Sequence, residues 1–280
     1  MNSKDLEGLL RARFPELRIE PLLVVDVGFG STVVETGDGI IFRFARSERA
    51  AAGHEREARL LRQLVGRLPV EVPDPQWRIE PGADVPFGAV GYRELGGEPV
   101  RHDASAALAH EVAAFLRALH GVTGAEAADA PDERVALRDA TLPVLRDRLE
   151  REEVDRLGQW WAGMLADDDF LRFEPALRHG DLWNENLLVA DGRLVGVVDW
   201  GAAAIGDPAE DFAPLRHIGD AFAEAVLDAY GADAPLRHRA WRHWELRELH
   251  GIRAALELGD EEELADGIAK LRAGPILRRE

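Results

Sequence analysis

The 280-residue chain contains no cysteine. Without thiols it can form neither a disulfide framework nor a thiolate metal site, and a cytoplasmic location is the simplest interpretation. It also has no uninterrupted apolar run near the length that a membrane helix needs. The N-terminal residues, MNSKDLEGLL, lack the basic region and apolar core of a secretory signal. We therefore expect a globular chain with no membrane partner.

Basic residues are in short supply. Lysine and arginine number 34 against 52 aspartates and glutamates, which gives a formal net charge of −18. Binding of nucleic acid needs a basic face, so we expect no nucleic-acid partner. A small cationic substrate would be attracted by such a field. The alternative is that the excess acid serves only solubility.

The N-terminal third is patterned as a sheet with one long helix. Short β-type runs at Leu22–Val27, Ser31–Glu35 and Ile40–Phe44 are separated by Gly and Asp, which is typical of consecutive antiparallel hairpins. Apolar residues then recur at helical spacing in a predicted helix over Ala50–Leu68. Two or three further strands fit between residues 77 and 95.

The remainder is mostly helical and holds one hairpin. An amphipathic helix is predicted over Ala104–His120, and strands at Leu187–Val189 and Leu194–Val198 are joined by a turn that contains Asp-Gly. Because strands and helices are segregated, the chain is predicted to be an α+β protein in two lobes. We place the boundary at Gly96-Gly97, with lobes at residues 1–96 and 97–280.

One segment carries the pattern of phosphoryl-transfer chemistry. That reaction needs a carboxylate to orient and deprotonate the acceptor hydroxyl, oxygen ligands for Mg²⁺, and cations on the nucleotide phosphates. Protein kinases place an Asp in a loop, an Asn five residues later, and a second Asp after a hairpin. Asp181, Asn186 and Asp199 follow this order and spacing around the predicted hairpin. The alternative for these residues is a turn and a loop cap, and for His179 we favour a structural role that shapes the loop.

Three consecutive motifs make the chain recognisable. The run HGDLWNENLLV (residues 179–189), then GVVDWG (residues 196–201) and AIGDPAEDF (residues 204–212) resemble the aminoglycoside phosphotransferase family. The resemblance covers nearly the whole chain and implies a two-lobed protein-kinase-like fold. It implies ATP or GTP as phosphoryl donor and Mg²⁺ as cofactor. By position it assigns Asp181 as the catalytic base and Asn186 and Asp199 as the metal ligands.

A second acidic pair belongs to the same resemblance. Asp207 and Asp211 match the acidic positions of the third motif. They are expected to brace the catalytic loop, and Asp211 is also a candidate substrate contact.

The N-terminal part should supply the nucleotide-binding residues. Gly28, Gly30 and Ser31 lie in a strand–turn–strand, where a glycine-rich loop would cover the phosphates. In kinases a strand lysine contacts the α- and β-phosphates and pairs with a helix glutamate. Here Arg43 stands at the lysine position, and alternation turns it away from its flanking phenylalanines. Glu57 is its expected partner.

The acceptor should bind beside Asp181, against the helical part. Glu245 and Glu248, in a Trp-containing helix, are the candidate substrate contacts, because carboxylates would suit a polyamino sugar. The first candidate function is therefore O-phosphorylation of an aminoglycoside-type antibiotic, with a role in resistance. The alternatives are a kinase of another hydroxylated metabolite or a macrolide, and a nucleotide-binding module that has lost catalysis.

Overall fold

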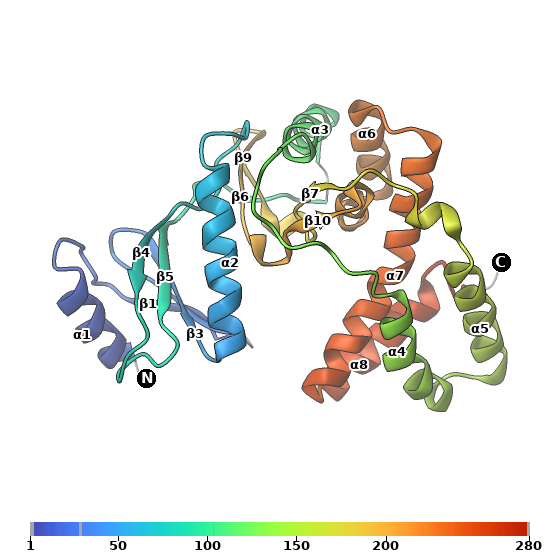
Figure 1. Ribbon diagram of the computed structural model, residues 1–280, viewed down its shortest axis with the longest axis horizontal. Helices are drawn as coiled ribbons and strands as arrows, with labels where there is room; N and C mark the ends of the chain where they lie inside the picture. The colour runs from blue at the N-terminus through green and yellow to red at the C-terminus, as the bar shows by residue number, and fades with distance from the viewer. Residues whose placement is uncertain (1–2, 28–29, 103, 279–280) are drawn as a thin grey trace.

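The N-terminal part of the protein is a five-stranded antiparallel sheet in the order β1-β2-β3-β5-β4 (Figure 1). The computed structural model describes residues 3–27, 30–102 and 104–278. In β3 the side chains of Ile40, Phe42 and Phe44 are buried, and Arg43 lies on the opposite face, as strand alternation requires. The strands are β1 (Leu23–Val27), β2 (Ser31–Glu35), β3 (Ile40–Ala45), β4 (Pro75–Ile79) and β5 (Ala89–Arg93).

Two helices cover the two faces of this sheet (Figure 1). Helix α1 (Ser3–Arg13) packs on the face that carries Phe42. Helix α2 (Glu48–Leu64) lies on the Arg43 face, and the side chain of Ser47 caps its N-terminus by accepting from the Ala50 N–H. It ends four residues before the predicted end. Gly66 follows in the left-handed region with a φ of +73° and terminates it.

A small three-stranded sheet links this part to the helices. β6 (Glu98–Pro99) pairs with β8 (Leu187–Ala190), which pairs with β9 (Arg193–Val197). In the turn of the hairpin, Asp191 and Gly192 have φ values of +50° and +76°. Both central residues of a tight hairpin turn need positive φ, so the Asp-Gly pair in the sequence correctly predicted this turn.

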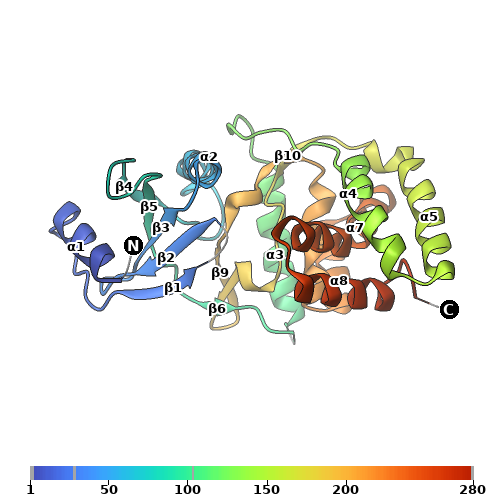
Figure 2. The ribbon, with the colours of Figure 1, turned by 90° about the horizontal axis from the view of Figure 1, so that it is seen from below.

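The C-terminal part packs its helices around two cores. One core joins α3, α6 and the β8–β9 hairpin, and it also receives the last turns of α2. The other core lies between α4, α5, α7 and α8, at the end farthest from the large sheet (Figure 2). A further strand pair joins β7 (Ala176–Arg178) to β10 (Ala204–Gly206). The helices are α3 (Ala106–His120), α4 (Arg134–Arg148), α5 (Arg151–Leu165), α6 (Asp220–Tyr230), α7 (Ala234–Leu258) and α8 (Glu261–Ala273).

The segregation of sheet and helices confirms the predicted α+β class. The number of strands between residues 77 and 95 resolves to β4 and β5. The lobe boundary at Gly96-Gly97 stays a prediction. Among the described residues, none of the helices has the length and apolar character needed to cross a bilayer.

Candidate active site

Asp181 lies in the loop that leads from β7 to the β8–β9 hairpin. Its side chain is 39% exposed and lines an open cavity. Gly180, directly before it, has a φ of +82°, and a Cβ there would lie 2.6 Å from the Ala202 carbonyl oxygen. The backbone path that directs Asp181 to the cavity therefore requires glycine at position 180.

The side chain of His179 connects this loop to the end of β9. Its Nδ1 accepts a hydrogen bond from the Asp181 backbone N–H at 3.3 Å, and its Nε2 lies 3.0 Å from the Val198 carbonyl oxygen. These partners place the proton on Nε2. Burial lowers the pKa of His179, against the opposing charge of Asp211, so the ring is neutral. His179 shapes the loop, as expected from the sequence, and is not exposed to a ligand.

Asp211 is fully buried beneath the same loop. Its oxygens accept hydrogen bonds from the backbone N–H groups of Gly180 at 2.7 Å and His179 at 2.9 Å. Oδ2 also lies 3.1 Å from Nε2 of His120. Burial alone would raise the pKa of Asp211, but His120 and the backbone donors lower it. With its oxygens engaged and no exposed surface, Asp211 braces the loop, and the candidate substrate contact at this residue is wrong.

Asp207 is buried as well and caps the short 3-10 turn at Pro208–Phe212. It accepts from the Ala209 N–H at 3.0 Å and pairs with Arg239 at 2.9 Å. Its carboxylate also lies 3.2 Å from Nε2 of His243. It therefore ties the segment after β10 to α7.

Asn186 and Asp199 flank the β8–β9 hairpin. Because Leu187 pairs with Val197, the two residues emerge at the same end of the hairpin. The Asn186 Nδ2 donates to the Asp181 carbonyl oxygen at 2.8 Å, which turns its amide oxygen away from that carbonyl. Asp199 has a φ of +61°, which is uncommon for a residue other than glycine. Such backbone strain persists only where the surrounding structure enforces it, and it is often found at functional sites.

A cavity of about 490 Å³ separates Asp199 from the glycine-containing turn of the sheet. We call it the sheet-side cavity. Its wall brings together Gly30, Ser31, Arg43, Glu57 and Asp199, which the sequence places far apart. The remaining predicted residue of this group, Gly28, lies outside the described residues.

Arg43 and Glu57 form the expected ion pair across this cavity. Nη1 of Arg43 donates to both carboxylate oxygens, at 2.7 and 2.9 Å, and the side chains are 21% and 7% exposed. Burial lowers the pKa of Arg43, but Glu57, Tyr92 and Asp199 outweigh it and raise the pKa above its usual value. A fully charged guanidinium therefore faces the cavity. Its contact with phosphate stays a prediction.

A hydroxyl–imidazole contact in the same cavity was not predicted. Ser31 Oγ lies 2.8 Å from Nε2 of His54 on α2. Burial, with a further contribution from Arg43, lowers the pKa of His54 to about 4. His54 precedes Glu57 by three residues, so helical spacing could have placed both on the face toward the sheet.

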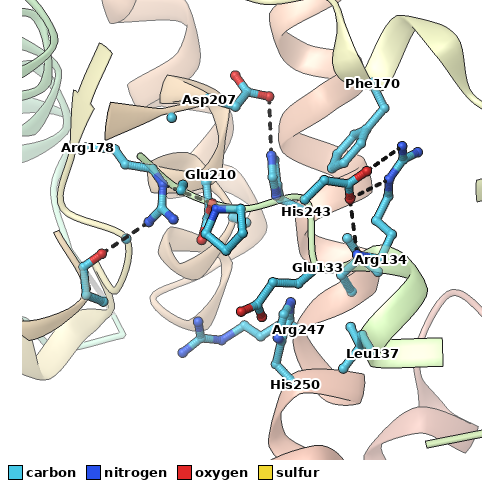
Figure 3. A pocket seen from close by; sticks show the side chains of 18 of the residues that line it. Glu133, Arg134, Leu137, Phe170, Arg178, Asp207, Glu210, His243, Arg247 and His250 are labelled. Atoms are coloured by element: carbon cyan, nitrogen blue, oxygen red, sulfur yellow. Dashed lines mark hydrogen bonds and ion pairs between the residues drawn. The ribbon is translucent and has the colours of Figure 1, made fainter. Parts of the chain in front are cut away.

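Asp181 opens into a second cavity, of about 510 Å³, which we call the helix-side cavity (Figure 3). Arg247 of α7 lines it and places Nη2 3.7 Å from Asp181 Oδ1. Burial raises the pKa of Asp181, while the positive charge of Arg247 opposes this effect. Arg247 is held in turn by His217, whose Nε2 accepts from Nε at 2.7 Å.

The carboxylates of the helix-side cavity are balanced by arginines. Among the residues that the structure describes, five acidic ones line it, and each has a guanidinium within the distance of an ion pair. The pairs are Asp132–Arg134 at 3.0 Å, Glu133–Arg253 at 2.8 Å, Asp181–Arg247 at 3.7 Å, Asp207–Arg239 at 2.9 Å and Glu210–Arg178 at 3.1 Å. The net charge of −18 is therefore not concentrated in this cavity.

The two glutamates predicted to contact substrate lie on the wrong face of α7. The lining face of the helix presents His243, Arg247 and His250. At 3.6 residues per turn, Glu245 and Glu248 point roughly 150° away from the centre of that face. Glu245 instead pairs with Arg242 at 2.5 Å. The helix was predicted correctly. Periodicity could not show which of its faces lines the cavity, because both faces carry charged residues.

Sequence reasoning also missed Arg178 and Glu133. Arg178 directly precedes the His-Gly-Asp motif, so its position was a usable signal. Glu133 lies just before α4 in a charged segment that has no motif. Only the packing of α4 against α7 brings it to the cavity.

Comparisons with known proteins agree with this fold. The model of the phosphotransferase enzyme family matches residues 24–247. Viomycin phosphotransferase of Streptomyces vinaceus is 32% identical, over 94% of this chain and 97% of that protein. A solved structure of APH(2")-IIia with GDP and kanamycin has a TM-score of 0.86 at 23% identity, and covers 96% of this chain and 97% of that one. Macrolide 2'-phosphotransferase type I has a TM-score of 0.74 at 26% identity, with 97% and 98% covered. These likenesses confirm the predicted fold.

Proposed function

Because this chain belongs to the phosphotransferase enzyme family, we propose that it transfers the γ-phosphoryl group of ATP or GTP to a hydroxyl of a small-molecule antibiotic. One observation carries the proposal. Asp199 and Arg43 line one cavity, Asp181 lines the other, and His179 connects the two segments through hydrogen bonds. The nucleotide binds in the sheet-side cavity and the acceptor in the helix-side cavity.

On the donor side, Arg43 contacts the phosphates while Glu57 holds it in place. Gly30 and Ser31 belong to the turn that covers them. Asn186 and Asp199 would hold Mg²⁺, since an amide oxygen and a carboxylate at one end of a hairpin are the hard oxygen ligands it prefers. When bound, Mg²⁺ neutralises charge that develops on the phosphates.

On the acceptor side, Asp181 orients the hydroxyl and accepts its proton. The hydroxyl oxygen forms a bond to the γ-phosphorus, the bond to the β-phosphate oxygen breaks, and ADP or GDP leaves. Asp211 fixes the backbone on which Asp181 stands, through its hydrogen bonds to Gly180 and His179.

Viomycin and aminoglycosides are the first acceptors to test, because relatives of this chain are named for them. A macrolide is the second candidate. Leu137, Phe170 and Leu246 form an apolar part of the wall of the helix-side cavity, which suits an acceptor with an apolar face. We also propose that the lobes meet near Gly96-Gly97, with residues 1–96 as the nucleotide-binding lobe and residues 97–280 as the catalytic and substrate-binding lobe.

The test is phosphorylation of viomycin, kanamycin and a macrolide by the purified chain, with ATP or GTP and Mg²⁺, followed by mass spectrometry of the acceptor. Asp181→Asn should lower kcat by about 10²-fold or more, because the general base is lost. Nucleotide affinity should stay near that of the wild type, since Asp181 lines the other cavity. Wild-type turnover by the Asn variant would contradict the assignment.

A further inference from the structure

Arg178 is a buried arginine in the wall of the helix-side cavity. It is the last residue of β7, directly before His179, and is 8% exposed. It lines the cavity together with Gly180 and Asp181. Figure 3 shows it on the opposite side of the cavity from Arg134.

The guanidinium of Arg178 makes few hydrogen bonds for a group so deeply buried. It carries five N–H donors. Nη1 lies 3.5 Å from the Ala202 carbonyl oxygen, at the outer limit of a hydrogen bond. The buried Nε of Arg178 lies 3.1 Å from Glu210 Oε2, within the distance of an ion pair. This Nε nevertheless makes no hydrogen bond within the described part of the chain. Buried donors are normally paired, so Arg178 has donor capacity that the protein does not use.

Two glycines leave the space that this guanidinium occupies at the cavity wall. A Cβ at Gly180 would lie 2.0 Å from Nη1 of Arg178, and a Cβ at Gly206 would lie 3.0 Å from its Nε. A side chain at either position would displace the guanidinium. The space for Arg178 is therefore shaped by the Asp181 loop on one side and by β10 on the other.

Within the described part of the chain, two other arginines line the cavity, and both are engaged. Arg134 binds both oxygens of Asp132 and donates to the Met164 carbonyl oxygen at 2.8 Å. Arg247 reaches Asp181 and His217. Arg178 differs from both, because its nearest acceptors are poorly aligned or distant.

We propose that Arg178 binds the acceptor by donating to a carbonyl or carboxylate oxygen that lies beside the reacting hydroxyl. This rests on the proposed function, which places the acceptor in the helix-side cavity. Arg178 precedes Asp181 by three residues and lines the same cavity, so the group it binds is a near neighbour of the hydroxyl. An ammonium group at that place would be repelled. The substrate class is a hydroxyl compound with an oxygen acceptor next to the phosphorylated position.

The test uses a charge-balanced pair of variants. Arg178→Met alone would leave the partly buried Glu210 carboxylate, whose side chain is 32% exposed, without its counter-charge and could prevent folding. The double variant Arg178→Met/Glu210→Gln removes both charges. Glu210→Gln alone is the matched control, because it keeps the guanidinium.

The kinetic readout is the acceptor KM, measured with a compound that the wild-type enzyme phosphorylates. The double variant should raise it by about 10-fold or more over Glu210→Gln, the usual loss for a hydrogen bond to a charged group. The nucleotide KM should be the same in both variants. An acceptor KM equal to that of the control, or a lower kcat with an unchanged acceptor KM, would overturn the proposal.

A binding readout keeps the inference separate from the proposed function. Thermal unfolding is measured with millimolar N-acetylserinamide, whose hydroxyl lies between two amide carbonyls, and with ethanolamine, whose hydroxyl lies beside an amine. N-acetylserinamide should raise the Tm of the wild type and of Glu210→Gln but not of the double variant, and ethanolamine should raise none. If no antibiotic is phosphorylated, the proposed function fails while this readout still decides the role of Arg178. Equal protection of all three proteins, or protection of none, would refute it.

Discussion

Arg43 stands where kinases carry a lysine, and the structure shows how the larger group is accommodated. Both hydrogen bonds to Glu57 come from Nη1. Tyr92, which lines the same cavity, also hydrogen-bonds to this guanidinium. The remaining N–H groups of the planar fork are available to a further partner in a geometry that a lysine ammonium could not offer. Since Arg43 lines the sheet-side cavity, we propose phosphate oxygens as the partners of these remaining N–H groups.

Substitutions at Arg43 test this contact. Arg43→Ala should raise the nucleotide KM by about 10-fold or more, because a charge-assisted contact is lost. Arg43→Lys should keep activity, while Arg43→Met keeps the length of the stem without the charge and should resemble Ala. Steady-state kinetics with ATP and GTP would measure this. A wild-type nucleotide KM for Arg43→Ala would move the role to another cation, with Arg46 the next candidate.

Arg247 of α7 lies beside Asp181 in the helix-side cavity. The two groups are 27% and 39% exposed and 3.7 Å apart, so solvent weakens the pair. Such pairs contribute up to about 1 kcal/mol, which corresponds to about fivefold in rate. We expect Arg247→Met to lower kcat by about that factor, and Arg247→Lys to restore most of it. The nucleotide KM should be unchanged in both variants, and steady-state assays with varied nucleotide concentration would give kcat and KM together.

At the scale of elements, the Asp181 loop depends on a carboxylate that lies distant in the sequence. Asp211 accepts from two successive backbone N–H groups and contacts His120. Asp211→Asn turns one acceptor oxygen into a donor and removes the charge, which should lower the free energy of unfolding by about 2–3 kcal/mol. Asp228→Asn, at an exposed position on α6, is the matched control and should have little effect.

The stability difference between the wild type and Asp211→Asn should depend on pH. The net effect of the surroundings of Asp211 lowers its pKa below the ordinary 3.8. A carboxyl group whose pKa is lower in the folded than in the unfolded state contributes its full stabilisation of the fold above the unfolded-state pKa. That contribution is lost as the pH falls through the folded-state pKa. The stability difference between wild type and Asp211→Asn should therefore be constant above about pH 5 and shrink below about pH 4. Chemical denaturation across this range would measure it, and a difference that grows on acidification would refute it.

At the scale of the whole molecule, charge and site are separated. The chain carries a net charge of −18, while the carboxylates of the helix-side cavity are each paired with an arginine. The field that attracts a cation is thus long-ranged and sensitive to salt. Raising ionic strength from about 0.01 M to 0.15 M shortens the screening length from about 30 to 8 Å. If kanamycin is an acceptor, its kcat/KM should fall over this range, whereas that of an uncharged acceptor should not. Equal salt dependence for both would show that the field has no role.

Helix α2 connects the two parts of the molecule. Its Glu57 holds Arg43 of the sheet, while Leu60, Leu61 and Leu64 are buried in the core of α3, α6 and the hairpin. A change in the position of α2 would therefore alter both the nucleotide contact and the packing of the catalytic hairpin.

The sequence by itself determined what depends on local pattern. The spacing of Asp181, Asn186 and Asp199 around an Asp-Gly hairpin needs only strand pairing over a few residues. The orientation of Arg43 follows from the two-residue period of a strand. The α+β class follows from the separation along the chain of segments with the two-residue period of strands and segments with the 3.6-residue period of helices.

The tertiary structure alone decided which faces meet. The 3.6-residue period of α7 shows that the helix has distinct faces, but not which face lies toward Asp181. Glu245 and Glu248 were therefore predicted as substrate contacts, whereas Arg247 is the residue that lines the cavity. Asp211 is withdrawn from substrate because the backbone of His179 and Gly180, 32 and 31 residues earlier, folds over it. Such long-range contacts depend on packing that no local pattern encodes, since burial is a property of neighbours in space and not of neighbours in sequence.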